Sequence, residues 1–164
     1  MFSPEALESI RRYHNGSLDD VKRYLGGGTD GDVWESSTRT AIKVLKSERG
    51  YWNEHDSYRR LQDYGITEKL GEFWVPRLID CNDELRIIEI EMMHQSPYVI
   101  DFAKVRIDPP PDFSPEIEEY TENEGQKNFR HNWPRVKCLL DDLASFGLYY
   151  LDAKPGNITF PDML

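Results

Sequence analysis

The sequence contains few cysteines and no surplus of basic residues, and each shortage excludes a class of protein. Its two cysteines, Cys81 and Cys138, are far apart and lack both metal-motif spacing and a companion histidine motif. We therefore expect free, buried thiols in a reducing compartment and no disulfide framework. The 20 basic residues are outnumbered by 30 acidic ones, which gives a net charge of −10. Because nucleic-acid binding needs a basic surface, we expect no nucleic acid as a direct partner.

Long apolar runs are also missing. No segment approaches the roughly 18 consecutive apolar residues of a membrane span, and the first residues lack the charged and apolar regions of a signal peptide. We therefore expect a soluble, cytoplasmic protein with no membrane contact. The 164 residues are 38% hydrophobic and 12% aromatic, which is enough to build a core. This length suits one domain or two small lobes that share a cleft.

The first part of the chain, residues 1–19, is predicted to be a helical extension. Ser3 suits a helix cap and Pro4 the first turn, and apolar residues recur at helical spacing between residues 3 and 15.

Residues 20–93 are predicted to form a lobe of five antiparallel strands and one helix. Short β-type runs alternate with glycine-rich and polar turns, and one segment returns to helical spacing with Trp52, Tyr58 and Leu61 as inward positions. The expected strands span residues 21–26, 31–36, 39–46, 75–80 and 85–92, and the expected helix spans residues 50–64.

Residues 94–164 are predicted to form a second, reduced lobe that is mainly helical, which makes the whole fold α+β. Its segment 108–124 contains seven acidic residues and no basic one, and four prolines within 108–115 prevent regular structure there. We expect an exposed connector, followed by a charged helix from residue 114 to about residue 130. Pro134 then begins an amphipathic helix that ends at Gly147.

A glycine-rich segment lies between the first two predicted strands. A dinucleotide-binding fold would open a helix within such a segment, so that interpretation is disfavoured. A loop between two strands instead suits a flap over nucleotide phosphates, because glycine lets the backbone approach them without a Cβ. A glycine-rich hairpin turn without a ligand is the alternative. The pattern is Gly26-x-Gly28-x-x-Gly31-x-Val33.

Lys43 interrupts the apolar run that begins at Ala41 in the third predicted strand. A lysine that points inward from such a strand is costly unless it meets an anion. Glu54 shares a helical stripe with Tyr58 and Leu61, so it is predicted to face the sheet and Lys43. The alternative places Lys43 on the solvent face of the strand and Glu54 on a solvated helix face.

The segment from Leu143 to Ile158 contains the run Asp152-Ala153-Lys154-Pro155-Gly156-Asn157. It closely resembles the helix end and catalytic loop of serine/threonine protein kinases, where the order is Asp-x-Lys-Pro-x-Asn. With the glycine segment and Lys43, it makes the chain similar to members of the protein-kinase-like superfamily from about residue 20 to residue 160. A polar surface turn is the alternative interpretation of this loop alone.

The resemblance implies a kinase-like fold with a site for ATP and Mg²⁺. Asp152 would orient and deprotonate the acceptor hydroxyl of a protein or small molecule, and Lys154 would neutralise the γ-phosphate. Asn157 would bind the metal. The strand at 85–92 resembles the one that leads into the hinge, where Glu89 and Glu91 both suit the family's acidic position. The remaining nucleotide-binding positions would be Gly26, Gly28, Gly31, Val33, Ala41, Lys43 and Glu54.

The sequence departs from the family pattern after Asn157. No Asp-Phe-Gly segment follows, so the resemblance implies a kinase truncated after its catalytic loop, or a fragment of a longer one. Asp162 comes five residues after Asn157, too soon for a hairpin to return it to a metal. Tyr150-Leu151 also replaces the family's usual His-Arg. Four large apolar residues could form a core over this end: Trp74, Phe102, Trp133 and Leu148.

Three functions stay open on the sequence. The first is a minimal ATP-dependent kinase, which the loop residues favour and the missing metal carboxylate opposes. The second is a pseudokinase-like module that binds nucleotide without turnover. The third is an interaction protein whose acidic segment 108–124 contacts a basic protein partner, with a solvated, flexible insertion as the alternative for that segment.

Overall fold

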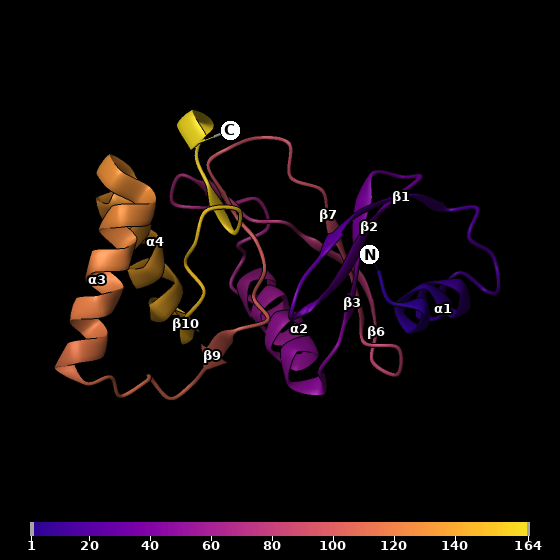
Figure 1. The fold of residues 1–164 in the computed structure, drawn as a ribbon, viewed down its shortest axis with the longest axis horizontal. Coiled ribbons are helices and arrows are strands. Elements are labelled where there is room, and N and C mark those ends of the chain that lie inside the picture. The colour runs from indigo at the N-terminus through magenta and orange to yellow at the C-terminus, as the bar shows by residue number, and fades with distance from the viewer. Residues whose placement is uncertain (1, 164) are drawn as a thin grey trace.

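The computed structural model describes residues 2–163. It is an α+β structure, with a β-sheet and two helices in one part and helices with short strands in the other (Figure 1). No helix within the described residues is both long and apolar enough to cross a membrane. The α-helices are α1 (Pro4–Tyr13), α2 (Glu48–Asp63), α3 (Pro115–Phe129) and α4 (Trp133–Ser145).

The main sheet has five antiparallel strands in the order β1-β2-β3-β7-β6, which confirms the predicted antiparallel sheet. β3 is buried on both faces because α2 packs on one face of the sheet and α1 on the other. The strands are β1 (Val21–Gly27), β2 (Gly31–Ser36), β3 (Thr40–Leu45), β6 (Leu78–Asn82) and β7 (Ile87–Glu91).

The amino-terminal helix α1 packs directly on the sheet. It begins at the predicted cap, where Ser3 Oγ accepts a hydrogen bond from the N–H of Ala6 at 3.0 Å. Ile10 is fully buried against Ile42 and Ile87. The described part of the amino-terminal extension, residues 2–19, therefore contributes to the core of the first part of the fold.

Helix α2 covers the opposite face of the sheet. Ser47 caps it by accepting a hydrogen bond from the N–H of Gly50 at 3.0 Å. Tyr58 is buried at its predicted inward position, but the prediction for Trp52 is wrong, since 39% of that residue is exposed. Tyr51 takes the inward position instead, because neighbouring residues lie about 100° apart around a helix.

Among the described residues, six short strands were not predicted from the sequence. Two of them lie in the predicted first lobe, and four lie within residues 94–163, where α3 and α4 supply most of the regular structure. One sheet has the order β11-β8-β5-β4, and a separate pair joins β10 to β9. Each strand has two or three residues. β4 pairs with its neighbour β5, and each of the other five pairs with a strand that is distant in the sequence. They are β4 (Lys69–Leu70), β5 (Phe73–Trp74), β8 (Tyr98–Val99), β9 (Val105–Ile107), β10 (Leu148–Tyr150) and β11 (Ile158–Thr159), followed by the 3₁₀ turn at Pro161–Met163.

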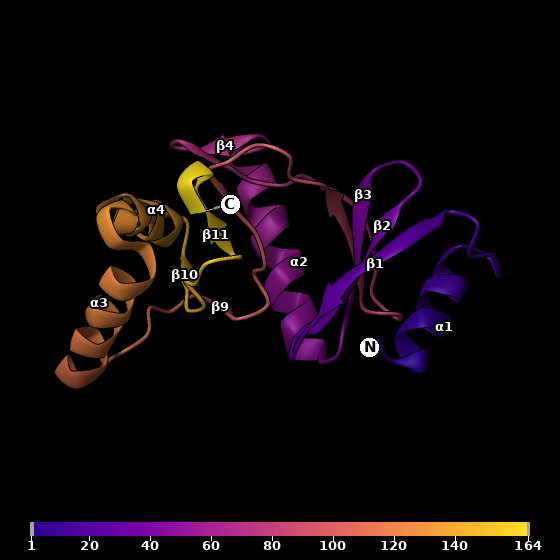
Figure 2. The ribbon, with the colours of Figure 1, turned by 45° about the horizontal axis from the view of Figure 1, so that its top comes forward.

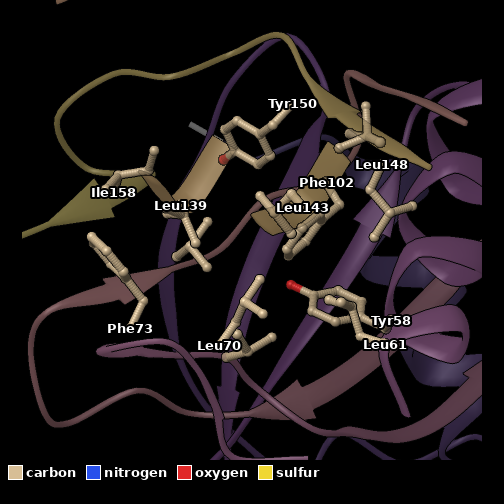
Figure 3. Close-up of a cluster of buried hydrophobic side chains, with 14 of the residues drawn as sticks. Tyr58, Leu61, Leu70, Phe73, Phe102, Leu139, Leu143, Leu148, Tyr150 and Ile158 are labelled. Atoms are coloured by element: carbon tan, nitrogen blue, oxygen red, sulfur yellow. The ribbon is translucent and has the colours of Figure 1, made fainter. Parts of the chain in front are cut away.

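One hydrophobic core joins the two parts (Figure 3). Tyr58 and Leu61 of α2 share this core with Leu139 and Leu143 of α4, all within 1% of full burial. In Figure 2, β10 and β11 lie between α2 and α4. Of the four apolar residues predicted to cover the carboxyl end, three are buried, namely Phe102, Trp133 and Leu148.

The acidic segment lies away from this core. Residues 108–114 form an irregular and mostly exposed connector, as predicted, and another 3₁₀ turn (Arg130–Asn132) joins α3 to α4. The acidic side chains at the start of α3 are exposed.

Candidate functional site

A cavity of about 790 Å³ lies between the main sheet and the loop at residues 152–157. This volume is in the range of small-molecule sites in proteins. Besides this loop, five parts of the structure line the cavity: the β1–β2 turn, the α2 face of β3, Glu54 of α2, residues 90–93 at the end of β7, and residues 98–101.

The glycine segment forms the turn between β1 and β2. The N–H of Gly28 donates a hydrogen bond to the carbonyl of Gly31 at 3.0 Å. Gly26 has a φ of +146°, and a Cβ at Gly31 would collide with the carbonyl oxygen of Val44 on β3. Among the described residues, nothing lies within 4 Å of the place a Cβ would take at Gly28. The space beside Gly28 is therefore open to a ligand.

Lys43 and Glu54 form an ion pair at the inner wall of the cavity. Lys43 Nζ lies 2.7 Å from Oε2 of Glu54 and 2.9 Å from Oδ1 of Asp101. Only 7% of Lys43 and 1% of Glu54 are exposed. The lysine thus points inward from β3 and not to solvent.

Burial and neighbouring charges together set the protonation of Lys43 and Glu54. Burial alone would lower the pKa of Lys43, but the negative charges of Glu54 and Asp101 outweigh it and the pKa is raised. Burial raises the pKa of Glu54, and the neighbouring ammonium offsets this only in part. Oε1 of Glu54 is buried without a hydrogen-bond partner among residues 2–163.

The loop after β10 brings three polar side chains together. Lys154 Nζ donates a hydrogen bond to Oδ2 of Asp152 at 2.7 Å. The side-chain amide of Asn157 donates to the same carboxylate oxygen at 3.0 Å and to the backbone carbonyl of Asp152 at 3.1 Å. Partial burial favours the protonated acid, but Lys154, Lys104 and Asn157 outweigh it and lower the pKa of Asp152. Asp152 is therefore an ionised carboxylate at neutral pH.

Lys104 bridges the two sides of the cavity mouth. Its Nζ lies 3.2 Å from Asp30 in the glycine segment and 3.5 Å from Asp152 in the loop. The hydrogen bond to Asp30 is the main cause that raises the pKa of Lys104, and Asp152 adds to it. The lysine thus joins the β1–β2 turn to the loop.

The structure brings most of the predicted site residues to one cavity. Asp152 is bonded to lining residues without itself being part of the lining. The predicted residues that line the cavity are Gly26, Gly28, Gly31, Val33, Ala41, Lys43, Glu54, Glu91, Lys154 and Asn157.

The structure corrects the position of Glu89. Its carboxylate accepts hydrogen bonds from Thr40 and, at 2.8 Å, from the hydroxyl of Tyr13 in α1. Because α1 packs on the face of the sheet opposite to α2, Glu89 lies outside the cavity. Glu91 ends β7 at the edge of the cavity and lines it.

Asp101 is a site residue that the sequence analysis missed. It lines the cavity and contacts Lys43. A signal was present, since Asp101 and Phe102 match the first two residues of the Asp-Phe-Gly segment that the resemblance to kinases made us expect after Asn157. They precede the loop in the sequence, so the order expected of the kinase family concealed them.

The cysteines are less buried than predicted. Cys138 is exposed and Cys81 is half-buried. Ligand atoms of His55, Cys81 and Asp83 lie within 4.8 Å of one another. The packing of α2 near β6 thus gives Cys81 a histidine neighbour that the sequence spacing does not show.

Comparisons with known proteins give a limited likeness. No protein-family model matches the chain, and no curated protein does. Similar solved structures include the streptomycin–ATP ternary complex of APH(2'')-IIa (18% identity, TM-score 0.40) and the gentamicin complex of APH(2'')-IIa (20%, 0.39). The ADP-bound aminoglycoside phosphotransferase APH(2'')-Ib is another (20%, 0.40). Each alignment covers 58% of this chain and 30% of the other chain.

Proposed function

We propose that the chain binds ATP in this cavity and transfers its γ-phosphate to a hydroxyl group of a protein or small molecule. The observation that carries the proposal is the buried Lys43, which Glu54 holds at the wall of a cavity lined by the glycine segment. An ammonium group has three donors. Glu54 and Asp101 each accept one, which leaves one donor for a phosphate oxygen.

The apolar part of the cavity suits the adenine base. Val33, Ala41 and Ile90 give it apolar walls. Glu91, Met92 and Met93 also line the cavity, and their peptide groups would pair with the polar edge of a base. The phosphates would then extend toward Lys43 and the glycine segment.

The loop residues would carry the transfer. Asp152 would accept the proton of the acceptor hydroxyl while the oxygen of that hydroxyl bonds to the γ-phosphorus. The bond between that phosphorus and the β,γ-bridging oxygen breaks, and ADP leaves. Lys154 would exchange its contact with Asp152 for the γ-phosphate, whose charge it neutralises.

Asn157 fits the role of a Mg²⁺ ligand. Its amide nitrogen donates both of its hydrogen bonds to Asp152, which points the amide in a fixed direction. Its Oδ1 accepts no hydrogen bond within residues 2–163, so a carbonyl oxygen of the kind that Mg²⁺ prefers is available. When bound, the metal would neutralise phosphate charge.

A nucleotide-binding module without turnover is the second candidate. The observation that favours it is the position of Asp152, whose Oδ2 is within 3.5 Å of both Lys154 and Lys104. A base held by two cations is a weaker proton acceptor. This candidate shares the ATP site and differs in having no transfer step.

Calorimetric titration with ATP, with and without Mg²⁺, tests the shared part of the proposal. Wild-type protein should bind ATP, and Lys43→Met should weaken binding by about tenfold or more. Transfer of radiolabelled phosphate to water, peptides or small alcohols then separates the two candidates. No binding of ATP at millimolar concentration would refute both.

A further inference from the structure

The pairing of β8 with β11 places two potential metal ligands side by side. The strands are antiparallel, with Val99 opposite Ile158. One step beyond this pair, the N–H of Ile100 donates a hydrogen bond to the carbonyl of Asn157 at 2.9 Å. Asp101 follows immediately, so Asp101 and Asn157 leave the strand pair at the same end. Both line the cavity.

The backbone and a neighbouring ring anchor Asp101. Its φ is +66°, a left-handed conformation that aspartate adopts more readily than most residues. The next side chain, Phe102, is fully buried and packs edge-to-face on two rings. Its ring centroid lies 4.9 Å from that of Tyr58 in α2 and 5.5 Å from that of Tyr150 in β10. The carboxylate of Asp101 is therefore held at the cavity wall by the packing of its neighbour.

One oxygen of Asp101 is left for a ligand. Lys43 and the N–H of Ala103 both donate to Oδ1. Oδ2 accepts no hydrogen bond within residues 2–163. A carboxylate with one anchored and one free oxygen suits monodentate binding of a hard cation.

The charges at the inner wall also call for a cation. Two carboxylates, Glu54 and Asp101, face the single ammonium of Lys43. Oε1 of Glu54, in a side chain that is 99% buried and lines the cavity, has no partner among the described residues. A nucleotide would add several further negative charges there. One lysine does not balance this arrangement at low dielectric.

We propose that Asp101 and Asn157 together bind a divalent cation, Mg²⁺ in the cell, beside the nucleotide phosphates. This inference rests on the proposed ATP site. It makes the site complete in a permuted order, because the metal-binding carboxylate directly follows β8, a strand that precedes the catalytic-type loop in the chain. No carboxylate is then needed after Asn157 or from a second chain.

The fold tolerates this order because strand pairing does not depend on the order of strands in the chain. β8 pairs with β11, which follows the loop, and β9 pairs with β10, which precedes it. Hydrogen bonds therefore join the segment that carries Asp101 to the strand before the loop and to the strand after it. The connector at residues 108–114, α3 and α4 link the segment of Asp101 to the loop along the chain. None of their residues lines the cavity.

Asp162, the acidic residue that follows Asn157, has another role. Its carboxylate accepts hydrogen bonds from the side-chain amide of Asn132 at 3.2 Å, and it lies 3.1 Å from His131. Asp162 does not line the cavity. It therefore gives a matched control that carries the same functional group close to Asn157 in sequence.

Mn²⁺ is a suitable probe because its free form gives an electron paramagnetic resonance signal that bound Mn²⁺ loses, and a titration without protein corrects for the Mn²⁺ that ATP itself binds. ATP and Mn²⁺ are titrated into wild-type protein, Asp101→Asn and Asp162→Asn, with thermal unfolding as the check on folding. We expect Asp101→Asn to weaken metal-dependent ATP binding at least tenfold, while ATP binding without metal changes less. Asp162→Asn should match the wild type. Equal binding by wild type and Asp101→Asn would overturn the inference.

A second measurement uses unmutated protein, in case Asp101→Asn does not fold. Fe²⁺ with ascorbate and peroxide cleaves a peptide chain near the metal that it replaces. We expect cuts near residues 101 and 157 that added Mg²⁺ suppresses. Cuts near residue 157 without cuts near residue 101 would overturn the inference. ATP binding of equal affinity with and without metal would overturn this inference but not the proposed function. No ATP binding under any condition would overturn the proposed function as well.

Discussion

The ammonium nitrogen of Lys43 lies 2.7 Å from Oε2 of Glu54, and both side chains are almost fully buried. This contact joins β3 to α2 across the inner wall of the cavity. Because neither charge has ready access to water, the pair serves the fold as well as the site.

Lys43→Met should therefore destabilise the protein as well as weaken ATP binding. Removing one partner of a buried pair typically costs about 3–5 kcal/mol, because the other charge is left uncompensated. The loss should be larger at high pH. Without the ammonium, burial raises the pKa of Glu54 further, so folding favours its protonated form and stability falls as pH rises above the unfolded value of about 4.3.

Urea unfolding at about pH 5 and about pH 8 checks this sign. Lys127→Met is the matched control, because Lys127 is exposed on α3 and its variant should unfold like the wild type at both values. Equal stability of Lys43→Met and wild type at the higher pH would contradict the role of the pair.

Alanine at two glycines should separate folding from binding. At Gly31, a Cβ would overlap the backbone of Val44, and backbone cannot move aside cheaply, so Gly31→Ala should lower stability by about 1–3 kcal/mol. At Gly28, the space is open, so Gly28→Ala should leave the melting temperature unchanged. It should still reduce ATP affinity, by about tenfold, because the new methyl group stands where phosphates would lie.

Melting curves and ATP titrations of the two variants check this pair. If Gly28→Ala binds ATP as the wild type does, the glycine segment does not approach the phosphates.

Asp152→Ala should abolish phosphate transfer with little effect on ATP affinity. A positioned base contributes about 10²–10⁴-fold to such a step. Asp152 does not line the cavity, so nucleotide contacts should survive its loss. Single-turnover transfer assays measure this, with Asp162→Ala as the control carboxylate. Unchanged transfer would remove Asp152 from the catalytic role.

Lys104→Met should raise the pKa of Asp152. The lysine is 3.5 Å from that carboxylate, and it is one of the groups that hold the pKa below its ordinary value. Carbon-13 NMR of the labelled carboxyl group follows the titration, and Lys127→Met again serves as control. A titration curve that does not move would show that Lys154 and Asn157 alone set the protonation of Asp152.

Much of the site follows from local sequence patterns. The apolar run around Lys43 and the helical stripe of Glu54 predict an inward lysine and an inward glutamate, and the structure brings the two together. The glycine turn and the end of α4 were predictable for the same reason, because turn residues and helix ends act over a few positions. The loop after β10 was predicted from its resemblance to a kinase catalytic loop. The main strands and helices deviate from prediction by a few residues at their ends.

Other features have no local signal. Glu89 and Glu91 are both acidic residues of one strand, and the packing of α1 on the sheet decides that Glu89 bonds to Tyr13 while Glu91 lines the cavity. Five of the six short strands form because distant partners meet, not because two or three residues prefer an extended chain, and the sixth, β4, pairs with its neighbour β5.

Asp101 shows most clearly which features the sequence determined and which the tertiary structure decided. The sequence by itself determined the lysine and the glycine turn, since each depends on neighbours within about one helical turn or hairpin. It predicted the loop residues through their resemblance to a kinase catalytic loop. The tertiary structure alone decided that Asp101 lies beside Asn157. That juxtaposition depends on the pairing of β8 with β11, and strand pairing connects residues that are far apart in the chain in either order.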